Sequence, residues 1–221
     1  MNSHLSPFVA EFNRTVQSVE HLLSIARAGE LQREAIIILD TTLTDVGNEK
    51  AAAAARNEED YANLLLGCEC VAAVLISELK MWLLLKDEKP DEAWNELVTA
   101  QMASVDAVRA HKGFAHLEQY VQKLEAIEKI VFPPQVFVSS GMIVRRQECS
   151  ICGSDYDDCD HLIGRPYMGR FCYIIAQDIS LDHVAIVKEP ADKRCRVEEF
   201  RVEGGVRNRM TWRIERGEAD A

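Results

Sequence analysis

The sequence lacks the short motifs of the common nucleotide-dependent enzymes and hydrolases. It contains no Gly-x4-Gly-Lys-Ser/Thr phosphate loop, no Gly-x-Gly-x-x-Gly dinucleotide loop and no Gly-x-Ser-x-Gly nucleophile elbow. It also lacks an apolar run of the roughly 20 residues that cross a bilayer, because the run at residues 71–76 is followed at once by Ser77 and Glu78. Residues 1–4 have neither the basic nor the apolar region of a signal peptide. We therefore expect a cytoplasmic protein without a membrane span.

An excess of positive charge is absent as well. The 221 residues include 25 Lys and Arg against 36 Asp and Glu, so the formal net charge is −11. This excludes a general polyanion binder that is held by bulk electrostatics. The charge is uneven: residues 1–131 carry a net −9, whereas residues 193–216 hold eight basic and four acidic side chains. Hydrophobic residues make up 48% and charged residues 28%, which is typical of a globular protein.

Residues 1–131 have the periodicity of an antiparallel helical bundle. Apolar side chains recur at three- and four-residue steps, as on the buried face of an amphipathic helix. Ser6 and Pro7 form a start signal for the first helix, and Gly29 and Gly47 are expected to end the first and second helices. The third helix is expected at residues 51–86, and two more are expected before residue 131. Short connections predict antiparallel neighbours.

Pro133 and Pro134 end the helical pattern. Beyond them the sequence has short apolar runs that predict β-strands, and a Gly204-Gly205 turn predicts a final hairpin. The runs are residues 136–138, 142–145, 172–176, 183–187, 196–202 and 210–214. The sequence therefore predicts an α+β protein with a helical bundle domain at residues 1–131 and a small β-rich domain at residues 132–221.

The seven cysteines need an explanation, because a disulfide framework does not form in a reducing compartment. Cys149, Cys152, Cys159 and His161 form the pattern C-x2-C-x6-C-x-H. Three thiolates and one imidazole within a short segment match the tetrahedral preference of Zn2+, and the ion would supply folding energy to a polar loop. These four residues are the predicted metal ligands. Four protein donors leave no open position for a catalytic water, so we expect a structural ion.

Other donors near this pattern have simpler interpretations. Cys172, His183 and Cys195 are reserve ligands but are expected to be strand residues that face a core, and Cys68 and Cys70 are expected to be core thiols. Acidic residues crowd the predicted metal loop and are expected to form a solvated rim or a docking surface. They are Asp155, Asp157, Asp158 and Asp160.

The segment from Cys149 to Gly169, together with residues 184–191, resembles a short zinc-binding module of uncharacterised bacterial and phage proteins. The resemblance covers at most about 50 residues. It implies a bacterial setting, in a mobile-element or defence-related locus, and it implies no particular activity.

The helical half carries one further motif. Arg109 and His116 form an Arg-x6-His pattern that resembles the signature of HEPN ribonucleases, with His111 between them. In that family arginine stabilises phosphorane charge and histidine transfers protons. Two departures weaken the resemblance: Ala110 replaces the polar residue that commonly follows the arginine, and Gly113 interrupts the helix. We therefore expect no catalytic residues here.

Three functions remain open on the sequence. The first, which we favour, is a non-enzymatic zinc-binding adaptor or regulatory subunit that associates with a protein partner, or with itself through the helical domain. The second is a HEPN-like ribonuclease that uses Arg109 and His116. The third is a zinc domain that contacts nucleic acid through C-terminal arginines. These are Arg194, Arg196, Arg201, Arg207, Arg209 and Arg213.

Overall fold

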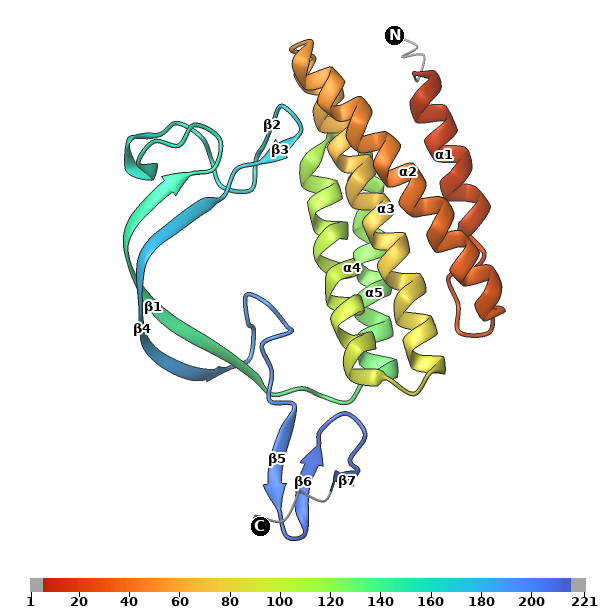
Figure 1. The fold of residues 1–221 in the computed structure, drawn as a ribbon, viewed down its shortest axis with the longest axis vertical. Helices are drawn as coiled ribbons and strands as arrows, with labels where there is room; N and C mark the ends of the chain where they lie inside the picture. Colours follow the sequence, from red (N-terminus) through yellow and green to blue (C-terminus); the bar gives the residue numbers. More distant parts are fainter. Residues whose placement is uncertain (1–5, 216–221) are drawn as a thin grey trace.

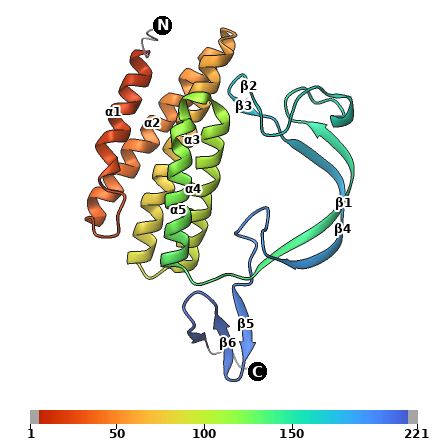
Figure 2. The ribbon, with the colours of Figure 1, turned by 180° about the vertical axis from the view of Figure 1, so that it is seen from behind.

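The structure is a computed structural model that describes residues 6–215. Five α-helices and one 3-10 helix come first, and seven strands in three small antiparallel sheets follow, which confirms the α+β prediction (Figure 1). The helices run side by side, with α1 on the side opposite the long strands (Figures 1 and 2). They are α1 (Pro7–Glu20), α2 (Gly29–Ala55), α3 (Glu59–Lys86), α4 (Pro90–Ala110), η1 (Lys112–Leu117) and α5 (Glu118–Val131).

The predicted start signals are in place, but two predicted stops are wrong. The Ser6 hydroxyl accepts a hydrogen bond from the Val9 N–H at 3.2 Å and so caps α1. Gly29 begins α2 instead of ending a helix, and Gly47 lies inside α2, which continues to Ala55. A glycine inside a helix costs about 1 kcal/mol relative to alanine, which burial of Leu39 and its neighbours outweighs. The third helix consequently begins at Glu59, eight residues later than predicted.

Helix α3 is the central helix of the bundle. By length and composition it is the one helix in residues 6–215 that could cross a membrane, but 67% of its apolar window is buried inside the protein. Its buried face includes Leu65, Leu75 and Leu79, and it packs against α2 and α4. This burial is that of a core helix, which agrees with the expected absence of a membrane span.

The strands form a long hairpin and two short sheets. β1 (Phe137–Cys149) pairs with β4 (Ile174–Val187), so that runs predicted as four short strands merge into two long ones. The connection between them holds η2 (Tyr156–Asp158) and a small hairpin of β2 (Pro166–Tyr167) and β3 (Arg170–Phe171). The third sheet contains β5 (Glu199–Val202), β6 (Gly205–Asn208) and β7 (Ile214–Glu215).

The β1–β4 hairpin bows away from the bundle and returns to it at the far end (Figures 1 and 2). There the β2–β3 turn touches the helices, because the Gly169 N–H donates to Asn63 Oδ1 at 2.8 Å. Gly169 has a φ of +74°, and a Cβ on it would lie 2.8 Å from Lys50 Cγ. Glycine is therefore required here both by the backbone conformation and by the close approach to the bundle.

The near end of the hairpin is fixed to the bundle through Trp94 of α4. Its indole stacks on Phe137 with ring centroids 6.2 Å apart and donates from Nε1 to the Lys193 carbonyl at 3.0 Å. Met210 belongs to the same buried core, so residues from both sides of the predicted boundary at residue 131 share one hydrophobic cluster.

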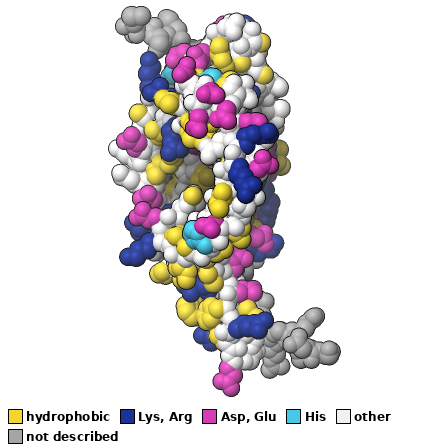
Figure 3. Space-filling model, turned by 90° about the vertical axis from the view of Figure 1, so that its left-hand side faces the viewer, with side chains coloured by type: hydrophobic (Ala, Val, Ile, Leu, Met, Phe, Trp, Pro, Cys, Tyr) yellow, Lys and Arg dark blue, Asp and Glu magenta, His cyan; other side chains and the backbone are white. Residues whose placement is uncertain are grey.

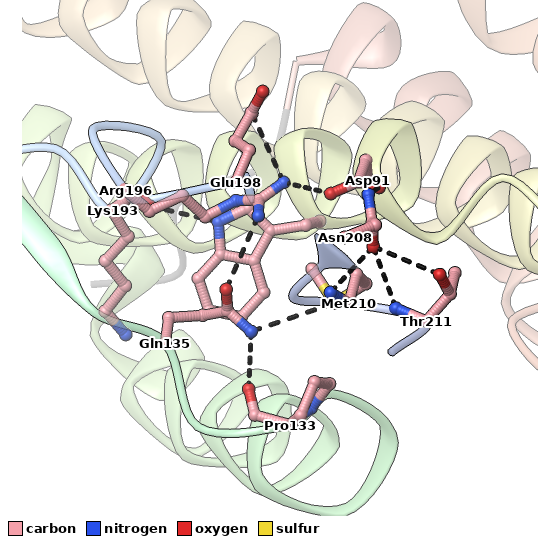
Figure 4. A network of polar contacts seen from close by, with 10 residues as sticks. Asp91, Pro133, Gln135, Lys193, Arg196, Glu198, Asn208, Met210 and Thr211 are labelled. Carbon is pink, nitrogen blue, oxygen red and sulfur yellow. Dashed lines mark hydrogen bonds and ion pairs between the residues drawn. The ribbon is translucent and has the colours of Figure 1, made fainter. Parts of the chain in front are cut away.

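A buried charge network joins the third sheet to the same region (Figure 4). The Arg196 side chain is fully buried, and its NH2 group lies 2.6 Å from Asp91 Oδ1 at the start of α4. Asn208 Nδ2 donates to the other Asp91 oxygen at 2.9 Å. These contacts attach the β-rich region to the start of α4. Residues 149–161, which carry the predicted metal ligands, lie at the opposite end of the β1–β4 hairpin (Figure 1).

Candidate metal centre

The first predicted ligand pair forms a tight turn at the end of β1. Cys149 is buried, and its carbonyl accepts from the Gly153 N–H at 2.8 Å. Gly153 has a φ of +73°, which L side chains rarely adopt. The Ile151 N–H points at the Cys149 sulfur from 3.4 Å. This turn directs the sulfurs of Cys149 and Cys152 to the same side, as a metal knuckle requires.

The second pair follows the one-turn helix η2. Asp155 caps η2 by accepting from the Asp157 N–H at 3.1 Å, and Cys159 follows directly. The Cys159 sulfur accepts from the His161 N–H at 3.2 Å and lies 3.2 Å from His161 Nδ1. Tyr167 supports the imidazole edge-on, with ring centroids 4.7 Å apart. The nitrogen that faces the cysteines is therefore Nδ1.

The four predicted ligands converge. The three Sγ atoms and the imidazole nitrogen all lie within 4.8 Å of one another, which is the spacing that a single metal ion requires. Cys152 Sγ lies 3.5 Å from Cys159 Sγ. The prediction that Cys149, Cys152, Cys159 and His161 come together is confirmed as a Cys3His cluster that could hold a metal ion.

The thiol pKa values favour a bound cation. Burial opposes ionisation of Cys149, but backbone N–H groups of Cys152 and Ile151 donate to its sulfur, and its pKa is lowered to about 6. Hydrogen bonds from Ser154 lower the pKa of Cys152. Burial raises the pKa of Cys159 to about 11. Because thiolates are the form that binds metals, the lowered pKa values of Cys149 and Cys152 favour ligation, whereas the raised pKa of Cys159 opposes it.

The donor set is closed. The four donors would fill all four positions around a tetrahedral ion, which is typical of structural and not of catalytic sites. The acidic residues of the loop are exposed to solvent, as expected of a rim. They are Asp155, Asp157, Asp158 and Asp160.

The reserve ligands have different surroundings from those predicted. Cys172 is buried beside the cluster, with its sulfur 3.8 Å from that of Cys149, and it lies between β3 and β4. His183 lies on β4 but faces solvent, and Cys195 is exposed in the loop after β4. The expectation that these two face a core is therefore wrong. Cys68 is a core thiol as expected, and Cys70 is half-buried.

The Arg109 and His116 side chains line different hollows of the bundle. Arg109 pairs with Asp106 at 3.6 Å and borders a hollow with Val121. His116 lies 3.2 Å from the Gly113 carbonyl through Nδ1 and borders a hollow with Phe12. His111 Nδ1 accepts from the Gly113 N–H at 3.0 Å. Within one chain, the arrangement does not direct the arginine and histidines at a common phosphate.

Several C-terminal arginines are held by protein groups. Arg194 forms a 2.7 Å ion pair with Asp192, and Arg196 is buried against Asp91. Arg207 lies over the Trp212 ring at 5.8 Å. Arg209 donates to the Pro134 carbonyl at 3.3 Å. These contacts leave less charge for phosphates than the count of arginines indicates.

Sequence reasoning missed an exposed apolar face on the β1–β4 hairpin. Cross-strand pairing places eight apolar residues on one side of the two strands, and six of them are exposed. Figure 3, which views the molecule from the side that carries the hairpin, shows hydrophobic side chains between charged ones. The alternation of apolar and polar residues in β4 is the sequence pattern that could have predicted this face. The hairpin's apolar face consists of Val138, Met142, Val144, Ile175, Ile179, Leu181, Val184 and Ile186.

No protein-family model, curated protein or solved structure matches the chain. The resemblances to a bacterial zinc-binding module and to HEPN ribonucleases therefore remain predictions, and the cluster itself is the basis for a functional proposal.

Proposed function

We propose that the protein is a non-enzymatic zinc-binding adaptor. A zinc ion held by Cys149, Cys152, Cys159 and His161 fixes the far end of the β1–β4 hairpin, and the hairpin offers its apolar face to a protein partner. The Cys3His cluster is the single observation that carries this proposal.

Zinc is the metal that suits this donor set best. Soft thiolates select zinc, copper(I) or iron–sulfur clusters, and three thiolates with one imidazole in a tetrahedral arrangement favour zinc. When bound, the ion supplies folding energy to the segment between β1 and β4. The protein residues position that segment: Gly153 forms the turn, Tyr167 orients the imidazole, and Asn63 holds the β2–β3 turn against the bundle.

The free-energy cost of leaving the hairpin's apolar face exposed to water supports a protein partner. Burying one exposed aliphatic side chain of this size gives about 1.5–3 kcal/mol, and five of the six exposed ones lie together, while the Arg146–Gln177 pair separates Ile175 from them. A contiguous exposed apolar patch is characteristic of an interaction site. Leu181 and Ile186 are 66% and 77% exposed. The partner would be a protein that covers this face with apolar side chains of its own.

Metal analysis and affinity capture from the host together test the proposal. Purified full-length protein should contain stoichiometric zinc without added metal. Wild-type chain should capture a partner that Leu181→Lys and Ile186→Lys both lose. Ile37→Lys is the matched control, because Ile37 is also 66% exposed but lies on α2.

The outcomes separate the parts of the proposal. Absence of zinc from the wild type would remove the metal role. Loss of the partner with Ile37→Lys alone would place binding on the helical domain and contradict the hairpin interface. Equal capture by all variants would contradict the adaptor role of both surfaces.

A further inference from the structure

Cys172 supplies a fourth sulfur, and so a fifth possible donor, at the edge of the metal cluster. Its side chain is 1% exposed, and its Sγ lies 3.8 Å from the Sγ of Cys149. In a tetrahedral zinc site with metal–sulfur bonds of about 2.3 Å, two sulfurs are separated by about 3.8 Å. The Cys149–Cys172 separation therefore equals that of two ligands of one ion, while Cys172 lies outside the group of four donors that are all within 4.8 Å of one another.

The backbone holds Cys172 in this position. Its N–H donates to the Arg165 carbonyl at 2.9 Å, and its own carbonyl accepts from the Gly164 N–H at 2.8 Å. Next to it, the Tyr173 N–H donates to Ser150 Oγ at 2.9 Å, which ties this segment to the first knuckle. Cys172 is thus anchored on both sides, directly before β4.

His161 is held less firmly than Cys172. Its backbone N–H donates to the Cys159 sulfur at 3.2 Å, whereas both the N–H and the carbonyl of Cys172 bond to other backbone groups. The His161 imidazole contacts the Cys159 sulfur and the Tyr167 ring. Zinc has no geometric preference from d-electrons and accepts sulfur or nitrogen donors. His161 is therefore the ligand that another sulfur or nitrogen donor can replace most readily.

We propose that Cys172 is an exchange ligand of this metal centre: its thiol loses a proton to solvent, its sulfur–metal bond replaces the bond from the His161 imidazole, and a four-sulfur set forms with Cys149, Cys152 and Cys159. This inference rests on the proposed metal site. In the four-sulfur form the ion joins the end of β1 directly to the start of β4, and the loop that carries His161 is released without loss of the metal.

Cobalt substitution in the full-length chain tests the exchange. Co2+ reports the number of thiolate ligands through the intensity of its sulfur-to-metal charge-transfer band. His161→Ala should still bind one equivalent, with a band about one third more intense than in the wild type, because three thiolates become four. Cys172→Ser should keep the wild-type spectrum. Cys195→Ser, which changes an exposed cysteine outside the cluster, is the control.

The double variant His161→Ala/Cys172→Ser decides the matter. Relative to His161→Ala, its cobalt affinity should fall by at least the roughly 10- to 100-fold that a residue supporting a ligand contributes, and its band should return to three-thiolate intensity. His161→Gln with and without Cys172→Ser repeats the comparison if the alanine variants do not fold.

Each result has a clear consequence. Equal affinity and equal spectra of the His161 variant with and without Cys172 would overturn the exchange and leave the Cys3His site intact. Failure of the wild type to bind cobalt or zinc would instead refute the proposed metal site.

Discussion

At the scale of single residues, the cysteines differ in the exposure of the thiol to solvent and in the direction in which their surroundings shift its pKa. Burial raises the pKa of both Cys68 and Cys70 to about 12, so both stay protonated at neutral pH. Cys195 is exposed. Since the thiolate is the reactive form, surroundings and not residue type decide which sulfurs react.

We therefore expect selective alkylation. In zinc-loaded protein at neutral pH, a maleimide should label Cys195 rapidly and leave Cys68 and Cys70 unmodified until the protein unfolds. Mass spectrometry of peptides after a timed reaction measures this. Labelling of Cys68 at the rate of Cys195 in folded protein would contradict the burial of the bundle core.

Arg196 is the residue whose loss should destabilise the base of the β-rich region most. Its buried guanidinium pairs with Asp91 and lies 5.9 Å from the Trp94 ring. Removing one partner of a buried pair costs about 3–5 kcal/mol, so Arg196→Ala should lower the free energy of unfolding by about 3 kcal/mol, because Asp91 keeps some solvent contact. Urea denaturation measures this loss.

Arg194→Ala is the matched control for Arg196→Ala. Arg194 pairs with Asp192 only two residues away, and both side chains are partly exposed. Such pairs contribute about 0–1 kcal/mol. If both variants lowered the free energy of unfolding equally, burial of the Arg196–Asp91 pair would not explain its contribution to stability.

At the scale of elements, the contact between the β2–β3 turn and the bundle can be tested through Gly169. In Gly169→Ala the new Cβ would collide with Lys50 Cγ and lie 3.2 Å from the Ala62 carbonyl, in addition to the strain of a positive φ. We expect faster hydrogen exchange in residues 166–171 and retention of the metal. Gly204→Ala is the control, because Gly204 has a φ of +93° with nothing within 4 Å of its Cβ position.

An equal effect of Gly204→Ala on its own hairpin would mean that backbone strain alone explains the result at Gly169. Loss of the metal from Gly169→Ala would mean that the docked turn is needed to form the cluster. The first result would contradict a turn that holds the hairpin end by close packing, and the second would contradict the expected retention of the metal.

The elements also show how far sequence reasoning reaches. Local chemistry predicted the cap at Ser6 and the cluster from Cys149 to His161, because these depend on neighbours in the chain. It failed at Gly47, where burial against α3 outweighs the propensity of glycine, and at the two long strands, which the pairing of distant residues creates. Cys172 was predicted only as a reserve ligand for the same reason: its proximity to Cys149 depends on the strand register.

At the scale of the whole molecule, the hairpin is attached at two ends by different means. At its base, Trp94, Phe137 and Met210 share a hydrophobic core with the helices. At its far end, the β2–β3 turn contacts the helices through the Gly169–Asn63 hydrogen bond, and the Cys3His cluster that could hold a metal ion lies in the same segment. A two-stranded ribbon is marginally stable by itself, so the far end is the part whose order should depend on the ion.

Removal of the metal should therefore loosen one part of the molecule only. With a strong chelator we expect hydrogen exchange to accelerate in residues 141–182, while the helices and the core around Trp94 keep their protection, because metal binding contributes folding energy only where its ligands lie. Cys149→Ser and Cys152→Ser should reproduce this pattern without chelator. Far-UV circular dichroism should retain the helical signal in all three samples. If the helices lost protection together with the hairpin, the bundle and the metal-bound end would form one cooperative unit, and the ion would stabilise the whole chain.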